Sequence, residues 1–134
     1  MSNEVIKNKL AKEPGLKQAA KIFGDIAADR LATAWSELDE DFAKAICNYS
    51  YGTMYSREIL SQKVRELCAV MTLTALDKQP ALAFHIRASI TCGASVEEVT
   101  EAIIQAHLYA GIPCIMSSLA TLKKVLEEMK QECR

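Results

Sequence analysis

Histidine is the side chain best suited to proton transfer near neutral pH, and the sequence holds two, His85 and His107. Both fall in stretches that are otherwise apolar and helical in pattern. At helical spacing the residues on the same face as His85 are all small: Ala81, Ala88, Ser89 and Cys92. Small neighbours leave room for a ligand beside the imidazole, so His85 is the sharper candidate for chemistry. The alternative is a core histidine that bonds to a backbone carbonyl.

Glu66 interrupts an otherwise largely apolar stretch, residues 61–76. A buried carboxylate must be paired or protonated. Residues 77–80 make a tight connection to the stretch that carries His85, so the two helices should pack as antiparallel neighbours. Both side chains then lie about 12 to 15 Å from the turn, at 1.5 Å per residue. We therefore predict that Glu66 and His85 touch. The alternative places Glu66 on an exposed first turn, where it complements the helix dipole.

Four further side chains are weaker candidates. Arg57 follows a glycine turn and could clamp a carboxylate with its planar fork, or be an ordinary surface arginine. His107, with Tyr109 beside it, could line the same cavity as His85, or pack in a core or an interface. Cys92 would be a nucleophile only with a lowered pKa. Because no cation lies within two residues of it, an inert buried thiol is favoured.

Apolar residues recur with a period close to 3.6 nearly everywhere, which predicts an all-α fold of about six to seven helices. The central feature is an antiparallel hairpin of residues 61–76 and 80–92. Its first helix has hardly any polar side and should be buried on all sides. Five more helices are expected at residues 2–12, 16–37, 39–51, 95–110 and from 113 onward. The last of these carries Ile115, Leu119, Leu122, Leu126 and Met129 on one stripe.

Several residues mark where these helices begin and end. Pro14 and Gly15 separate the first two helices, and the second buries a stripe of Leu16, Ala20, Phe23, Ala27, Leu31 and Ala34. Asp39 is a predicted N-cap and Gly52 a predicted stop. Pro80 suits a first helical turn and Gly93 a C-terminal stop. Ser95 and Glu98 form the pattern of a capping box, whose helix ends at Gly111.

Length and composition indicate a single soluble domain over residues 1–134. Charge is balanced, with 16 basic and 17 acidic residues, so neither nucleic acid nor a membrane is an expected partner. The first residues lack the apolar core of a signal peptide and no stretch is long enough to span a bilayer, which predicts a cytoplasmic protein. The five cysteines are far apart and should be reduced. No close pair of metal ligands is present, so no metal site is expected.

Five short segments occur in a fixed order: YSYGTMYSR at residues 49–57, REL at 65–67, HIRA at 85–88, GAS with EEV at 93–99, and YAGIP at 109–113. Together they resemble the carboxymuconolactone decarboxylase family over roughly residues 38–118. The resemblance implies an all-α fold in a ring-like homo-oligomer, a trimer or hexamer. It also implies cofactor-free loss of carbon dioxide from a small carboxylated lactone in aromatic catabolism.

The resemblance and the Glu66–His85 spacing together suggest a role for each candidate. His85 acts as the acid and oxyanion partner, and Glu66 orients it. Arg57, His107 and Tyr109 bind the substrate, with Arg57 and His107 holding its carboxylate. No metal or cofactor is needed, because the substrate supplies its own electron sink.

The sequence departs from related patterns at several positions. In the sister alkylhydroperoxidase D family a CxxC pair lies between the glutamate and the histidine, but here those positions hold Lys78 and Ala81. That removes dithiol chemistry. Tyr51 and Tyr55 stand where the decarboxylase family often has tryptophan, and Glu66 where a small hydroxyl residue is common. The alternatives are a peroxidase or oxidoreductase that uses a single thiol, most plausibly Cys92, and a non-catalytic member of the fold.

Overall fold

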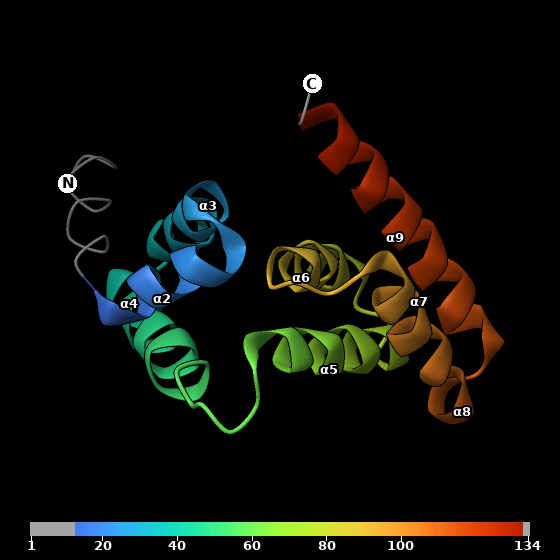
Figure 1. Ribbon diagram of the computed structural model, residues 1–134. Helices are drawn as coiled ribbons and strands as arrows, with labels where there is room; N and C mark the ends of the chain where they lie inside the picture. Colours follow the sequence, from blue (N-terminus) through green and yellow to red (C-terminus); the bar gives the residue numbers. More distant parts are fainter. Residues whose placement is uncertain (1–12, 133–134) are drawn as a thin grey trace. The chain divides into compact units, whose positions relative to one another are not determined.

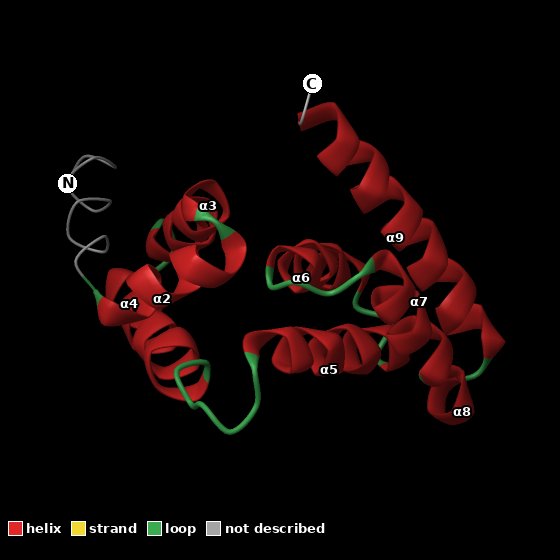
Figure 2. Cartoon of the chain, viewed as in Figure 1, coloured by secondary structure: helices red, strands yellow, loops and turns green. Residues whose placement is uncertain are grey.

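The computed structural model describes residues 13–132 and divides into two compact units, Met1–Leu60 and Ser61–Arg134. All of the regular structure in the described residues is helical (Figure 2), which confirms the predicted all-α class. The helix expected at residues 2–12 lies outside the described residues. The assignment of the whole chain to one domain stays a prediction.

The first unit contains helices α2 (Pro14–Phe23), α3 (Asp25–Ser36), α4 (Glu40–Cys47) and a π-helix, η1 (Asn48–Met54) (Figure 1). The single long helix predicted for residues 16–37 is wrong. Gly24 breaks it with a φ of 84°, a left-handed conformation that favours glycine. The predicted stripe is only partly correct. Its Leu16 and Phe23 are buried, but Ala20, Ala27 and Leu31 are half-buried and Ala34 is exposed, while Ala19, Ile22, Ala28 and Ala32 are also buried.

The predicted N-cap of α4 is confirmed, since the Asp39 carboxylate accepts a hydrogen bond from the backbone N–H of Phe42 at 2.8 Å. The predicted stop at Gly52 is wrong, because the chain continues as η1 through that residue. Close packing explains the glycine instead. Gly52 lies against Gly15 at the start of α2, and a Cβ added to Gly15 would lie 2.1 Å from the carbonyl oxygen of Cys47. Two glycines thus let α2 approach the α4–η1 backbone.

The second unit contains α5 (Gln62–Ala75), α6 (Gln79–Thr91), α7 (Val96–Gln105), α8 (His107–Ala110) and α9 (Ile112–Glu132). Most predicted boundaries are confirmed. Ser61 caps α5, Pro80 lies in the first turn of α6, and Ser95 with Glu98 forms the capping box of α7. The continuous helix expected over residues 95–110 is instead interrupted by a turn at Ala106, which separates α7 from α8.

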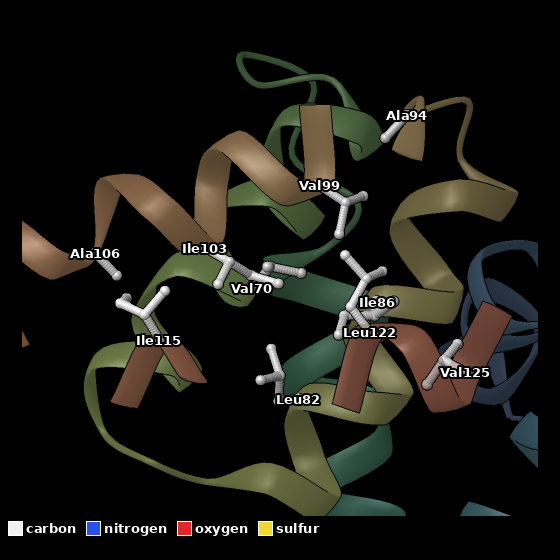
Figure 3. Close-up of a cluster of buried hydrophobic side chains, with 10 residues drawn as sticks. All are labelled: Val70, Leu82, Ile86, Ala94, Val99, Ile103, Ala106, Ile115, Leu122 and Val125. Carbon is white, nitrogen blue, oxygen red and sulfur yellow. The ribbon is translucent and has the colours of Figure 1, made fainter. Parts of the chain in front are cut away.

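Helix α5 is the centre of this unit and packs against α6, α7, α8 and α9. Figure 3 shows the core that these helices share: Val70, Leu82, Ile86, Ala94, Val99, Ile103, Ala106, Ile115, Leu122 and Val125. The expectation that α5 is buried on all sides is wrong. Its buried face carries Glu66, Val70 and Thr74, whereas Val64 and Cys68 are exposed.

The apolar stripe predicted for the last helix is confirmed in α9. Ile115 and Leu122 are buried, and Leu119, Leu126 and Met129 pack partly buried against the same core. Within residues 13–132 no helix is both long enough and apolar enough to cross a bilayer.

Candidate active site

The structure brings Glu66 and His85 into direct contact. His85 Nδ1 lies 2.7 Å from Glu66 Oε2, which confirms the contact predicted from spacing. The hairpin produces it: α5 and α6 run antiparallel, joined by a turn in which Asp77 adopts a φ of 51° and Lys78 N–H donates to the Leu73 carbonyl at 3.0 Å. The short turn fixes the register of the two helices, and the register places the two side chains opposite each other.

The two partners differ in their access to water. The Glu66 side chain is 0% exposed and the His85 side chain 20% exposed. Glu66 therefore lies on the buried face of α5, and the alternative of an exposed first turn is wrong. The imidazole keeps an edge at the surface while its acidic partner is sealed behind it. A carboxylate in such a setting holds its partner more firmly than one in water, because the local dielectric is low.

The hydrogen-bonding roles in this contact depend on the protonation of the two groups. With Glu66 ionised, the carboxylate can only accept hydrogen bonds, and in that state His85 Nδ1 is the donor. The ring of Phe84 meets the imidazole edge-on, with centroids 5.6 Å apart and planes at 80°. Helical spacing does not predict this contact of Phe84, because neighbours in a helix do not ordinarily face each other.

The surroundings of His85 are only partly as predicted. Of the small residues on its face, Ala88 and Ser89 are buried in packing, Cys92 is half-buried and Ala81 is exposed. Burial raises the pKa of the Cys92 thiol, and the nearby charge of Glu66 raises it further. Both effects oppose a nucleophilic thiolate at neutral pH. The cysteines among residues 13–132 are free thiols.

The three predicted substrate-binding residues are exposed. Arg57 follows η1 in the first unit. His107 and Tyr109 lie on α8, where His107 Nδ1 is 3.1 Å from the Ile104 carbonyl and Tyr109 is 74% exposed. Their roles in substrate binding stay predictions.

Helix α7 begins beside the start of α5, where Lys63 Nζ lies 2.9 Å from Glu98 Oε1. Helix α8 follows the far end of α7, about 14 Å further along at 1.5 Å per residue. Its side chains therefore lie towards the end of α5 opposite Lys63. The part of the chain that the structure describes holds no cluster of three or more His, Cys, Asp or Glu side chains able to bind a metal ion.

Comparison of the sequence with models of known families identifies the family of this helical chain. The model of the carboxymuconolactone decarboxylase family matches residues 40–124, more than half of the chain, and the chain belongs to this family. The match begins in the first unit and includes all of α5, α6, α7 and α8.

Three known proteins are similar in sequence to this chain. The chain is 26% identical over 115 residues to a 4-carboxymuconolactone decarboxylase of Acinetobacter baylyi, and the match covers 86% of each chain. It is 22% identical to the nitrosuccinic acid decarboxylase npaB of Metarhizium robertsii, with 96% of this chain and 89% of the relative covered. It is 27% identical to an uncharacterized 15.0 kDa protein of Paracoccus denitrificans, with 61% and 63% covered.

Proposed function

We propose that this protein is a cofactor-free carboxy-lyase that acts on a small carboxylated lactone, as in 4-carboxymuconolactone decarboxylation during aromatic catabolism in the cytoplasm. The observation that carries the proposal is the 2.7 Å contact between a fully buried Glu66 and a partly exposed His85. A proton donor held at the edge of the core suits a reaction that ends with protonation of carbon. Two relatives with decarboxylase names support the reaction class.

The chemistry requires one proton and a place for negative charge. The carbon–carboxylate bond breaks, carbon dioxide leaves, and the electron pair moves through the ring alkene into the lactone carbonyl. His85 Nε2–H lies against the resulting oxyanion and then gives its proton to carbon, after which solvent restores the proton. Glu66 stabilises the imidazolium before the transfer and fixes the ring throughout. Arg57, His107 and Tyr109 are proposed to bind the substrate.

The test is carbon dioxide release from 4-carboxymuconolactone by the purified chain, with nitrosuccinic acid assayed in parallel. Replacement of a general acid typically costs about 10² to 10⁴ in rate, and we expect that loss in His85→Ala. Gln131→Ala, an exposed change on α9, is the control. Full activity of folded His85→Ala would remove His85 from the mechanism. If the chain released carbon dioxide from nitrosuccinic acid and not from 4-carboxymuconolactone, the proposal of a carboxylated lactone as substrate would be wrong.

We also propose that the chain forms a homo-oligomer, a trimer or hexamer, through the surface around α8. Residues 102–122 contain no Asp, Glu, Lys or Arg. Five large apolar side chains in or beside this segment are exposed: Ile104, Leu108, Tyr109, Ile112 and Met116. An uncharged surface rich in large apolar side chains is typical of the centre of a protein interface, and a second copy meets it without needing opposite charge.

Light scattering after size exclusion tests this assembly. Leu108→Glu should lower the measured mass to that of a smaller species, because it places a charge in the centre of the surface. Ile26→Glu, at a 73% exposed position in the first unit, is the matched control. A monomeric unchanged chain, or an assembly that tolerates Leu108→Glu, would contradict the proposal.

A further inference from the structure

Glu66 has one oxygen more than His85 can satisfy. Oε2 faces His85 Nδ1, but Oε1 is buried and accepts no hydrogen bond in the structure. Leaving a buried charged acceptor unsatisfied is costly, more so than for a neutral group. A carboxylate that is to hold an imidazole needs a second donor within reach of Oε1.

Helix geometry limits where that donor can be. Side chains in an α-helix lean back towards the N-terminus, over the residues three and four positions earlier. For Glu66 these are Lys63 and Gln62. The Lys63 ammonium is engaged by Glu98 at 2.9 Å. Gln62 lies four residues before Glu66 on the same face of α5, a spacing at which an amide and a carboxylate can hydrogen-bond.

Other neighbours are poorer donors to Oε1. Arg65 precedes Glu66 directly, and adjacent side chains in a helix diverge by about 100°. Cys92 lies close enough for the Glu66 charge to act on it, but a thiol is a weak donor. Gln62 is half-buried and its amide oxygen is a buried atom, so its amide group points inward. Rotation of that amide by half a turn exchanges its oxygen for its N–H₂ group.

We propose that Gln62 is a positioning residue of the site, whose side-chain amide donates an N–H hydrogen bond to Glu66 Oε1. The result is a chain of three side chains, Gln62–Glu66–His85. Gln62 fixes the carboxylate plane, and the carboxylate fixes the imidazole. The contact itself is independent of the reaction, while its effect on turnover rests on the proposed function.

Nuclear magnetic resonance of the whole chain labelled with ¹⁵N-glutamine tests the contact without any substrate. One Gln62 side-chain N–H proton should be shifted downfield and protected from exchange, unlike those of exposed Gln131. Glu66→Leu should abolish both effects, and Cys92→Ala should leave them. Gln62 signals that match those of Gln131, or that survive Glu66→Leu unchanged, would overturn the proposal.

Kinetics separate positioning from mere packing. Gln62→Leu should lower kcat about tenfold with KM within about twofold, as expected for loss of one hydrogen bond to a charged group. Gln62→Lys restores a donor and should recover most of the loss, while Gln131→Leu should change nothing. An unchanged kcat in Gln62→Leu contradicts the role in turnover. If the chain releases no carbon dioxide at all, the proposed function fails and the resonance experiment still decides the contact.

Discussion

Removal of His85 should destabilise the fold by more than the size of the side chain suggests. His85 supplies the hydrogen bond that Glu66 Oε2 accepts at 2.7 Å, and Glu66 is 0% exposed. His85→Ala therefore removes the hydrogen-bond donor of Oε2 from a fully buried carboxylate. Loss of a hydrogen bond to a charged group costs about 1.5 to 3 kcal/mol, and breaking a buried ion pair about 3 to 5 kcal/mol. Because His85 is 20% exposed, water can approach, and we expect about 2 to 3 kcal/mol.

A double-mutant cycle pairs His85→Ala with a second substitution, Glu66→Leu, which removes the buried charge. Glu66→Leu replaces the carboxylate with an apolar side chain of similar volume, a substitution that is often neutral or stabilising in a buried pair, so we expect an effect within about 1 kcal/mol. In the Glu66→Leu background, His85→Ala should then cost only the lost packing, about 1 kcal/mol. The coupling between the two positions is the difference, about 1 to 2 kcal/mol.

The coupling is measured by urea unfolding, followed by circular dichroism, of the unchanged chain, the two single variants and the double variant. The unfolding free energy should fall with urea concentration at the same slope in all four proteins, so that differences in midpoint report differences in stability. Activity of the same preparations separates the two roles, since Glu66→Leu should keep stability and lose carbon dioxide release. Additive effects of the two substitutions, or a His85→Ala cost below about 0.5 kcal/mol, would refute the reasoning that the carboxylate depends on the imidazole.

Three further outcomes follow from particular residues. Thr74→Val should stabilise the fold by about 1 kcal/mol in urea unfolding, because the fully buried Thr74 hydroxyl has no hydrogen-bond partner, while exposed Thr72→Val should change little. Gly24→Ala should lower stability by about 1 to 2 kcal/mol through its φ of 84° alone, since no heavy atom crowds the site; a neutral result would reject that strain. The hydrogen bond from Lys63 lowers the pKa of Glu98, so its stabilisation is present at neutral pH and is lost as the pH falls through and below the ordinary carboxyl range near 4.5. Melting temperatures of the unchanged chain and Glu98→Gln should therefore converge in acid, and a constant difference would contradict this linkage.

Helix boundaries set by local chemistry could be predicted from the sequence. Asp39, Ser61 and the Ser95–Glu98 pair each satisfy backbone N–H groups within the next turn, so the information lies within four residues. The apolar stripe of α9 could be predicted equally well, because the helical period of its apolar residues alone identifies the buried face. The family was recognisable for the same reason, since it depends on short segments in order.

Helix boundaries that depend on packing between distant segments were not predicted from the sequence. Gly24 has the same local signal as a tolerated glycine inside a helix, and only the structure shows its left-handed φ. The π-helix η1 passes through Gly52 because α2 packs against it at Gly15, which is 37 positions earlier in the chain. The turn between α7 and α8 lies at Ala106, which is fully buried in the core of the second unit. No window of neighbouring residues contains these contacts.

The sequence by itself determined that Glu66 and His85 lie at similar distances from the turn of the hairpin, and from this their contact was predicted. A short turn and a fixed rise per residue set the register of a helical hairpin, whatever lies around it. Only the tertiary structure decided how the pair is exposed. Helices α7 and α9 pack against the hairpin, and in the folded chain the Glu66 side chain is 0% exposed while that of His85 is 20% exposed. Burial depends on distant segments, and for that reason it cannot be worked out from spacing.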